Sequence, residues 1–343
     1  MRIIALLIVV SILGSCVKDK PNDALEPQVS IGSGHKVYVT NEGNFGSNNG
    51  SVSLYELSNG NLTGDLYKAQ NNNAALGDVC QSMIKINNSF YIVVNNSGKI
   101  TIVNADDFKF KSGITGFNSP RYILPVSPNK AYVSDLYANT ISIIDLNSNT
   151  KTGSIPCNGW TEQMALLYNK AFVTNMKSNY LYVVNTINDQ ITDSVSVGPG
   201  AGSIVIDKNS KVWVLSAGSS TATIPGKLSR INPINMQIEL SLNFNTTDAP
   251  GNLCINAAKD RLYFLNTNIY SMSIAELTLP VNSFANGSSH TFYGLAVNNI
   301  TNDVYVSDAI DYIQKSSIMV YSPQGQLLNN FKAGINASGF YFE

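Results

Sequence analysis

The chain has 343 residues, of which 13% are charged, and its 22 basic and 23 acidic side chains nearly cancel. Such a balance produces no strong field of one sign, which argues against binding to nucleic acid or to an anionic membrane surface. Closed all-β repeat folds of this length often form a single domain, so one folded unit is expected.

The N-terminus reads as a lipoprotein signal peptide over residues 1–15. An apolar run over residues 3–13 follows Arg2 and is too short to span a bilayer comfortably. The next residues, Gly14-Ser15-Cys16, resemble the end of a bacterial lipobox, in which the cysteine is acylated and becomes the first residue of the mature protein. Cys16 is therefore the expected lipidation site, and its acyl chains would hold the protein on a membrane. The alternative is an ordinary cleaved signal with a chance cysteine.

Residues 16–36 form the next predicted segment, a lipidated cysteine followed by a flexible tether. The stretch is rich in lysine, aspartate, asparagine and proline and contains little apolar material. Val17-Lys18-Asp19 resembles the lysine-then-acidic export signals of Bacteroidetes surface lipoproteins. This resemblance implies a lipid-anchored protein of the outer membrane that is displayed on the cell surface.

From residue 37 onward the chain repeats one short strand pattern seven times. In each copy an aromatic side chain stands between apolar neighbours, and successive aromatics are 40 to 53 residues apart. Three positions after the aromatic, six of the seven copies carry a small polar residue, which suits a turn at the end of a strand. The seven aromatics are Tyr38, Tyr91, Tyr132, Phe172, Trp213, Tyr263 and Tyr305.

Each copy is predicted to contain four short strands. A second, alternating strand follows the aromatic one, a weaker third strand comes next, and a fourth precedes the following aromatic strand. In the sixth copy the second strand is expected over residues 272–277. Four strands in each repeat are typical of a propeller blade, so the sequence predicts an all-β, seven-bladed β-propeller with four-stranded blades. A β-solenoid would need shorter and more uniform coils, and a two-sheet sandwich would not repeat at this period.

The C-terminus is predicted to close the ring. A fourth strand precedes every aromatic strand except the first, at Tyr38, and residues 339–343 at the other end of the chain have the same apolar character. We therefore expect these residues to pair into the first blade as its innermost strand, which removes an exposed sheet edge. The predicted domains are thus the signal peptide, the tether and one propeller over residues 37–343.

The remaining cysteines and the two histidines argue against catalysis. Cys80, Cys157 and Cys254 show no metal-binding spacing and are most simply small buried side chains, although a disulfide between two of them stays open. His35 falls in the tether and His290 in a loop, and neither has partners at the spacing of a metal site or a Ser-His-Asp triad. No catalytic residue, cofactor or metal site is predicted, and the chain is expected not to be an enzyme. Carboxylates that the ring could still bring together are Asp135, Glu162, Asp308 and Asp311.

One face of the propeller is the predicted binding surface. It collects the loops that follow each aromatic strand and the loops that enter each innermost strand, around a funnel at the axis. Trp160 is the leading candidate, because Gly159 and polar neighbours leave it little local core. Aromatic platforms beside amides and charged groups would suit a flat ligand with polar edges, whereas packing of the rings between blades is the alternative. The candidate residues are the aromatics Phe45, Tyr137, Trp160, Tyr180, Tyr270, Phe292 and Tyr312, together with Arg121, Asp135 and Glu162.

Two insertions are expected to enlarge the same face. Residues 42–50 lengthen the first repeat and residues 217–226 lengthen the fifth, and both stretches are rich in glycine and serine. Long loops of this kind cost conformational entropy and are often functional, with mobility alone as the alternative. These irregular first and fifth repeats therefore mark the predicted binding face.

The repeats resemble YncE-type propellers over nearly all of the mature chain, through segments such as residues 130–135 (KAYVSD) and 139–146 (NTISIIDL). Residues 38–51 (YVTNEGNFGSNNGS) resemble the opening motif of a group of Bacteroidetes surface-lipoprotein propellers. That group includes the cobalamin-capturing lipoproteins that cap an outer-membrane TonB-dependent vitamin B12 transporter. The resemblance implies capture of a small nutrient, with cobalamin or a related corrinoid as one candidate ligand and a transporter barrel as partner.

The sequence therefore favours a non-enzymatic surface lipoprotein that binds a small nutrient on one propeller face and passes it to a transporter. Two other classes stay open. A propeller enzyme, such as a lyase or a lactonase, would turn over a ligand or require a bound metal. An adhesion or scaffold module would bind protein partners and no small molecule.

Overall fold

The computed structural model describes residues 36–343. The predicted signal peptide, the predicted lipidation site Cys16, His35 and nearly all of the predicted tether lie outside the described residues. Within the described part, strands dominate, and no helix there is long and apolar enough to cross a membrane. The all-β prediction is confirmed.

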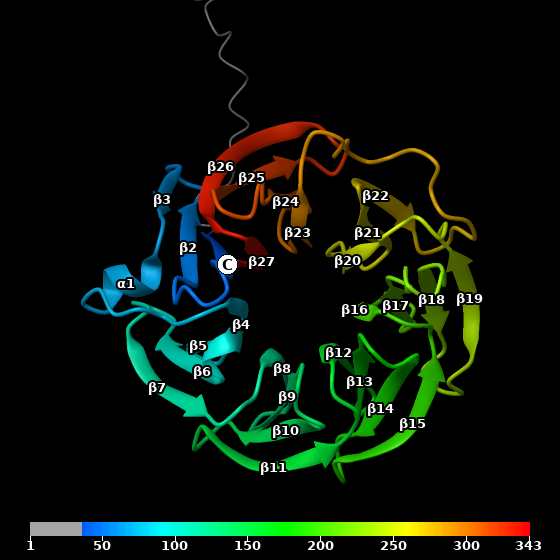
Figure 1. Ribbon diagram of the computed structural model, residues 1–343, viewed down its shortest axis with the longest axis horizontal. Coiled ribbons are helices and arrows are strands. Elements are labelled where there is room, and N and C mark those ends of the chain that lie inside the picture. Colours follow the sequence, from blue (N-terminus) through cyan, green and yellow to red (C-terminus); the bar gives the residue numbers. More distant parts are fainter. Residues whose placement is uncertain (1–35) are drawn as a thin grey trace, which may run out of the picture. The chain divides into compact units, whose positions relative to one another are not determined.

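Seven antiparallel sheets follow one another around a central axis, which confirms the seven-bladed β-propeller (Figure 1). From the innermost strand outward, blade 1 contains β27 (Ala337–Phe342), β1 (Lys36–Asn41), β2 (Ser51–Glu56) and β3 (Asn61–Thr63). Blade 2 contains β4 (Cys80–Ile86), β5 (Ser89–Val94), β6 (Lys99–Asn104) and β7 (Phe110–Thr115). Blade 3 contains β8 (Pro120–Ser127), β9 (Lys130–Asp135), β10 (Thr140–Asp145) and β11 (Thr150–Pro156). Blade 4 contains β12 (Thr161–Leu167), β13 (Lys170–Asn175), β14 (Tyr180–Asn185) and β15 (Gln190–Ser196).

The last three blades continue the same order from the axis outward. Blade 5 contains β16 (Ala201–Ile206), β17 (Val212–Ser216), β18 (Lys227–Ile231) and β19 (Ile238–Asn243). Blade 6 has three strands, β20 (Gly251–Ile255), β21 (Arg261–Asn266) and β22 (Asn268–Ser273). Blade 7 contains β23 (Phe292–Val297), β24 (Val304–Asp308), β25 (Lys315–Tyr321) and β26 (Leu327–Ile335). Two short helices, α1 (Leu66–Gln70) and a 3-10 turn (Asn95–Ser97), lie in the connections of the first two blades.

The seven repeated aromatics all lie on the second strand of their blades, and each is at most 4% exposed. This strand is covered on both faces by neighbouring blades, so it reads as a continuous apolar run rather than an alternating one. Tyr38 of blade 1, for example, lies 4.9 Å from the ring of Phe90 in blade 2. The indole N–H of Trp213 donates to Asp207 at 2.8 Å, which pairs a buried donor.

The C-terminal strand closes the ring as predicted. β27 pairs antiparallel with β1, so that Tyr38 lies opposite Tyr341 and Val39 opposite Phe340. The backbones of Lys36 and Glu343 exchange two hydrogen bonds of 2.7 and 2.9 Å. Both ends of the described chain therefore build one blade, and β1 has a partner on each edge.

The sixth blade departs from the prediction. The strand that follows the aromatic strand was expected over residues 272–277, but this strand, β22, spans Asn268–Ser273. The reason is a very tight connection, because Thr267 alone, at a φ of +59°, turns the chain between the paired residues Asn266 and Asn268. The segment after β22 forms no fourth strand and meets β22 through one bridge, between Ile269 and Ala285.

The three cysteines of the described chain are free. Cys80 is buried, and Cys157 and Cys254 are half-buried. Burial raises the pKa of the Cys157 thiol to about 11, which keeps it protonated at neutral pH. These side chains therefore behave as small packing groups.

Candidate ligand-binding face

A β-bulge lies at the start of every innermost strand, directly after its first residue. In β4 the extra residue is Gln81, which sits between the paired residues Cys80 and Ser82, and in β16 it is Gly202. A bulge re-aims a side chain and is frequent beside functional sites. The second residue of each innermost strand thus falls in a bulge, which defines a ring of seven residues around the axis. This axial ring consists of Ser338, Gln81, Arg121, Glu162, Gly202, Asn252 and Tyr293, in blade order.

The axial ring contains an ion pair between blades 3 and 4, in which Glu162 is buried and Arg121 is half-buried. The Arg121 Nε donates to Glu162 Oε1 at 2.8 Å, and Arg121 Nη1 also donates to Gln81 Oε1. Glu162 is 5% exposed, and burial raises the pKa of its carboxyl, against the opposing effect of the Arg121 charge. Sequence reasoning predicted both residues for this face, and the structure brings them into contact.

Glu42 adds a second carboxyl group to the same end of the axis. It follows β1, in the insertion over residues 42–50, and its Oε2 accepts a hydrogen bond of 2.7 Å from the Tyr293 hydroxyl. Burial raises the pKa of Glu42, while Arg121 acts in the opposite direction. Tyr293 in turn packs edge-on against Tyr312, with ring centroids 5.8 Å apart. The Arg121 charge thus acts on two carboxyls, Glu162 in direct contact and Glu42 without a hydrogen bond, and burial makes each hold its proton more readily than an exposed glutamate.

The axial ring is open on the side of blade 5, because Gly202 supplies no side chain there. A hollow of about 220 Å³ lies at this gap, with Arg121 and Glu162 on one wall and the small residues Gly200, Gly202 and Ala217 on another. A Cβ added at Gly202 would lie 2.8 Å from the Met176 sulfur. Any side chain at position 202 would therefore have to displace the flexible Met176 side chain, so only glycine leaves this side of the Arg121–Glu162 pair uncovered.

A second and larger hollow, of about 470 Å³, lies between the loops of blades 3 and 4. Tyr137 and Trp160 form its aromatic wall in an edge-to-face pair, with ring centroids 5.9 Å apart. Tyr137 is 63% exposed and Trp160 is 36% exposed, which is unusual for such large rings in a well-packed fold. The Lys177 Nζ lies 5.6 Å from the Trp160 ring centroid, within the range of a cation–π contact.

The backbone holds Trp160 in an uncommon conformation. Its φ is +72°, a region that bulky residues rarely adopt, and such outliers concentrate at functional sites. Its N–H donates to the Leu136 carbonyl at 2.7 Å, and its carbonyl accepts from the Met176 N–H at 2.9 Å. The turn that carries Trp160 is thereby tied to the loops of both neighbouring blades. Met176 lines the axial hollow and bonds the Trp160 backbone, so it connects the two hollows.

Asp135 does not offer its carboxylate to this face, and its prediction as a ligand contact is corrected. The residue is 1% exposed, and its two carboxylate oxygens accept hydrogen bonds from four backbone N–H groups. Two of these belong to Tyr137 and Ala138, in the loop beside Trp160. Asp135 therefore fixes the position of Tyr137 and has no free acceptor for a ligand.

The other predicted aromatics are spread over the face. Phe45, on the first insertion, is 79% exposed, and Tyr180, at the start of β14, is 47% exposed; neither lines the two hollows. Tyr270 stacks on Phe264 at 5.8 Å and lines a third hollow in blade 6. Phe292 stacks on the ring of His290 at 5.3 Å. The structure therefore joins Trp160 with Tyr137, and Arg121 with Glu162, but disperses the remainder.

His290 and two carboxylates have local partners in blade 7. The His290 Nδ1 lies 2.8 Å from Asp308 Oδ2, so this loop histidine has a carboxylate partner in its own blade. Hydrogen bonds from Gln314 and Ile313 lower the pKa of Asp311 to about 2, which marks a turn rather than an acid catalyst. The predicted carboxylates do not gather into one cluster, and the carboxyl beside the axial pair is Glu42.

Sequence reasoning missed several axial residues: Gln81, Asn252, Tyr293 and Ser338. A positional signal exists in six of the blades, because the axial residue precedes the repeated aromatic by ten to twelve positions. Its chemical type varies from blade to blade, so a search for repeated letters does not find it. The same offset would have indicated Arg121 and Glu162 as neighbours on one ring.

The fold and these hollows define a class of protein. It is a seven-bladed β-propeller with the axial ring at one end of its axis and an exposed aromatic pair in the loops of the same face, which is called the loop face below. The chain belongs to the family described as Domain of unknown function (DUF5074), whose model matches residues 35–342. No curated protein sequence matches the chain significantly.

Solved structures share the fold at low sequence identity. A quinonprotein alcohol dehydrogenase-like protein from Bacteroides thetaiotaomicron is 16% identical, with a TM-score of 0.70 over 90% of this chain and 78% of its own. A functionally unknown protein from Desulfotomaculum acetoxidans is 13% identical, with a TM-score of 0.67 over 90% and 99%. The periplasmic gluconolactonase of Pseudomonas aeruginosa is 10% identical, with a TM-score of 0.66 over 90% and 98%. These similarities establish the propeller fold and leave the function to the site.

Proposed function

We propose that the protein is a non-enzymatic surface lipoprotein that binds a small nutrient on its loop face. The observation that carries this proposal is the exposed pair of Tyr137 and Trp160, held beside an open hollow on a strained backbone turn. Exposed aromatic rings provide large contact areas at low entropic cost, and binding sites often combine them with a few fixed polar groups. Here the polar groups are those of the axial ring, next to the gap at Gly202.

A corrinoid fits this arrangement. Its macrocycle is broad and nearly flat, and its edge carries many amide groups, which can donate and accept hydrogen bonds. Tyr137 and Trp160 would contact the apolar part, while Asn252, Gln163 and the Arg121–Glu162 pair would meet the amides near the axis. Met176, which connects the two hollows, is 37% exposed and can adapt its flexible side chain to a large ligand. The opening motif over residues 38–51 supports the same ligand by resemblance.

The same resemblance supports the anchor and the partner. Lipidation at Cys16 would hold the protein at the outer membrane, on the cell surface, with residues 17–36 as a tether. An outer-membrane TonB-dependent transporter would then receive the ligand from the loop face. In this proposal the propeller itself needs no cofactor or metal.

Titration of the purified chain with cyanocobalamin and dicyanocobinamide tests the ligand. We expect saturable binding at micromolar concentration or below, seen as a shift in the corrin absorption spectrum. Trp160→Ala and Tyr137→Ala should each weaken binding about tenfold or more without moving the melting temperature, since both rings are exposed. Tyr168→Ala is the matched control, because Tyr168 is 59% exposed in the connection between β12 and β13, which lies on the opposite face. No binding of either corrinoid would reject this ligand, and equal losses in all three variants would reject this face.

A second candidate function is a propeller enzyme of the lactonase or lyase type. The observation that favours it is the Arg121–Glu162 ion pair together with Glu42 on the same face, because burial raises the pKa of both carboxyls. Such perturbed carboxyls can serve as general acids or bases. A gluconolactone hydrolysis assay on the wild-type chain and on Glu162→Gln tests this alternative. Turnover that the substitution abolishes would favour an enzyme, and no turnover above background would favour the binding protein.

A further inference from the structure

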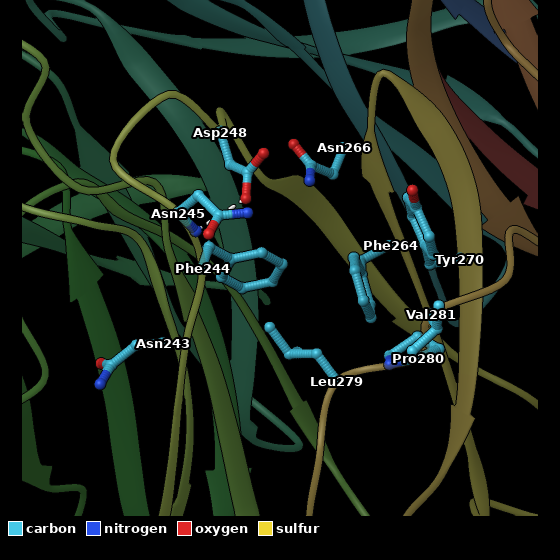
Figure 2. A pocket seen from close by; sticks show the side chains of 10 residues that line it. All are labelled: Asn243, Phe244, Asn245, Asp248, Phe264, Asn266, Tyr270, Leu279, Pro280 and Val281. Atoms are coloured by element: carbon cyan, nitrogen blue, oxygen red, sulfur yellow. Dashed lines mark hydrogen bonds between the residues drawn. The ribbon is translucent and has the colours of Figure 1, made fainter.

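A third hollow, of about 270 Å³, lies where blades 5 and 6 meet on the loop face. One wall comes from the connection between β19 and β20, with Phe244, Asn245 and Asp248, and the other comes from β21, β22 and the segment that follows (Figure 2). The axial ring and the hollow at Trp160 contribute no residue to this lining. The hollow is therefore a separate site.

The irregular sixth blade creates this hollow. The other blades place a fourth strand along their outer edge, whereas within the described chain β22 pairs with the following segment through a single bridge, between Ile269 and Ala285, and the Gly287 N–H donates to Asn268 Oδ1 at 2.8 Å. Instead of a strand, Leu279, Pro280 and Val281 form one end of the hollow. Val281 is 93% exposed, so this end is apolar and open to solvent.

The floor and the polar end of the hollow are held rigidly. Phe244 packs edge-on against Phe264 at 5.6 Å, and Phe264 stacks on Tyr270 at 5.8 Å. At the other end, Asp248 Oδ2 accepts the Asn245 N–H at 2.7 Å, and Asn266 Oδ1 accepts the Ala249 N–H at 3.3 Å. These bonds fix both polar side chains to the backbone before any ligand arrives.

Each of the two polar side chains keeps one free group. Figure 2 shows Asp248 and Asn266 facing each other across the polar end, without a hydrogen bond between them. Within the described chain, no hydrogen bond reaches Asp248 Oδ1 or Asn266 Nδ2, so one acceptor and one donor point into the same space. Among residues 36–343, no lysine, arginine or histidine lines the hollow, and the Asp248 carboxylate disfavours an anionic ligand.

We propose that this hollow binds one pyranose ring of a neutral carbohydrate. Neighbouring hydroxyl groups of such a ring can donate to Asp248 and accept from Asn266, while its C–H face contacts the apolar end and the ring of Tyr270. The volume is below the roughly 300–1,000 Å³ of pockets that enclose drug-sized molecules, which matches a single ring. A site of this kind on a cell-surface propeller would attach the protein to glycan chains, independently of the nutrient proposed above.

Saturation-transfer NMR on the purified chain, with methyl glucoside, methyl galactoside and methyl mannoside at millimolar concentration, tests the proposal. We expect transfer to at least one glycoside. Asn266→Asp should weaken its binding about tenfold or more, because the substitution replaces the free donor with an acceptor while it preserves the acceptor for the Ala249 N–H. Asn243→Asp, which adds the same charge at a lining position that points away from Asp248 and Asn266 in Figure 2, should change binding less than twofold.

Several outcomes would overturn the proposal. One is the absence of transfer to all three glycosides, and another is equal binding by the wild-type chain and both variants. A melting curve of Asn266→Asp that matches the wild type would show that the loss reflects the site rather than the fold. Cobalamin titration of Asn266→Asp separates the two sites, because the substitution should leave corrinoid binding unchanged, and a parallel loss of both ligands would contradict two independent sites.

Discussion

Removal of the C-terminal strand should cost a large part of the stability of the propeller. Deleting residues 339–343 leaves one edge of β1 without its partner from Lys36 to Thr40. Alternate residue pairs in an antiparallel ladder exchange two hydrogen bonds, so about six bonds are lost, each worth about 1 kcal/mol net. Three cross-blade aromatic contacts are lost as well: Tyr305 with Phe342 at 4.9 Å and with Phe340 at 5.9 Å, and Phe90 with Tyr341 at 5.3 Å. At about 1 kcal/mol per aromatic pair, the total reaches about 9 kcal/mol.

Thermal unfolding followed by circular dichroism measures this cost. A loss of that size should lower the melting temperature by about 15 °C or more, or prevent folding, because native domains are typically stable by only about 5–15 kcal/mol. Glu343→Gln is the matched control: it keeps the strand but removes the carboxylate that pairs with Lys85 and accepts from the Tyr38 hydroxyl at 3.2 Å. That variant should melt within about 2 °C of the wild type, since partly exposed ion pairs contribute little. A truncated chain that melts within a few degrees of the full chain would refute ring closure as a major source of stability.

Three further predictions concern the loop face. Asp135→Asn should cost about 1–3 kcal/mol in urea denaturation, because one amide oxygen cannot replace two carboxylate oxygens that accept from four backbone N–H groups. Asp145→Asn, at the half-exposed end of β10, should cost less, and equal costs would contradict the role of Asp135. Burial raises the pKa of Glu42, so the folded state keeps this proton to higher pH than the unfolded chain, and stability falls as the pH rises above the ordinary glutamate range. Glu42→Gln removes this titration, so the urea midpoint should fall less between pH 4 and 8 than it does in the wild type. An unchanged slope of the midpoint against pH would contradict this prediction. Gly202→Leu should weaken cobalamin binding about tenfold, because the new side chain occupies the gap and displaces the Met176 side chain, whose sulfur would lie 2.8 Å from the added Cβ; unchanged affinity would exclude the gap as the ligand position.

The strands that carry the repeated aromatics could be predicted because burial on both faces imposes a strong pattern on the sequence. Trp213 and Tyr132, for example, are fully buried between blades, and only apolar neighbours are compatible with that position. Ring closure followed from the same logic, since one blade otherwise lacked its innermost strand. The sixth blade could not be predicted in the same way, because a single residue, Thr267, makes its turn and leaves no loop signature.

The candidate site was predictable only in part. The pair of Tyr137 and Trp160 could be found because large rings among glycine and asparagine have no local core. The axial ring as a whole was not predicted, because a bulge fixes the position of a residue in the strand but does not require a particular residue type. Gln81, Gly202 and Tyr293 occupy equivalent positions and share no chemical feature. Asp135 was wrongly predicted to contact a ligand. An aspartate at the end of a strand often accepts hydrogen bonds from the backbone of the following turn, and the Asp135 carboxylate does so from the Tyr137 and Ala138 N–H groups.

The central claim is that the loop face around Trp160 and the axial ring holds the ligand, and hydrogen exchange with and without saturating cyanocobalamin tests it most directly. We predict that the ligand slows backbone exchange in the loops over residues 136–139, 158–162 and 176–178, which surround the hollow at Trp160 and the gap at Gly202. The loops of the opposite face, such as the one at Tyr168, should exchange at an unchanged rate. Unchanged exchange in all three loops, or protection confined to the opposite face, would contradict the claim.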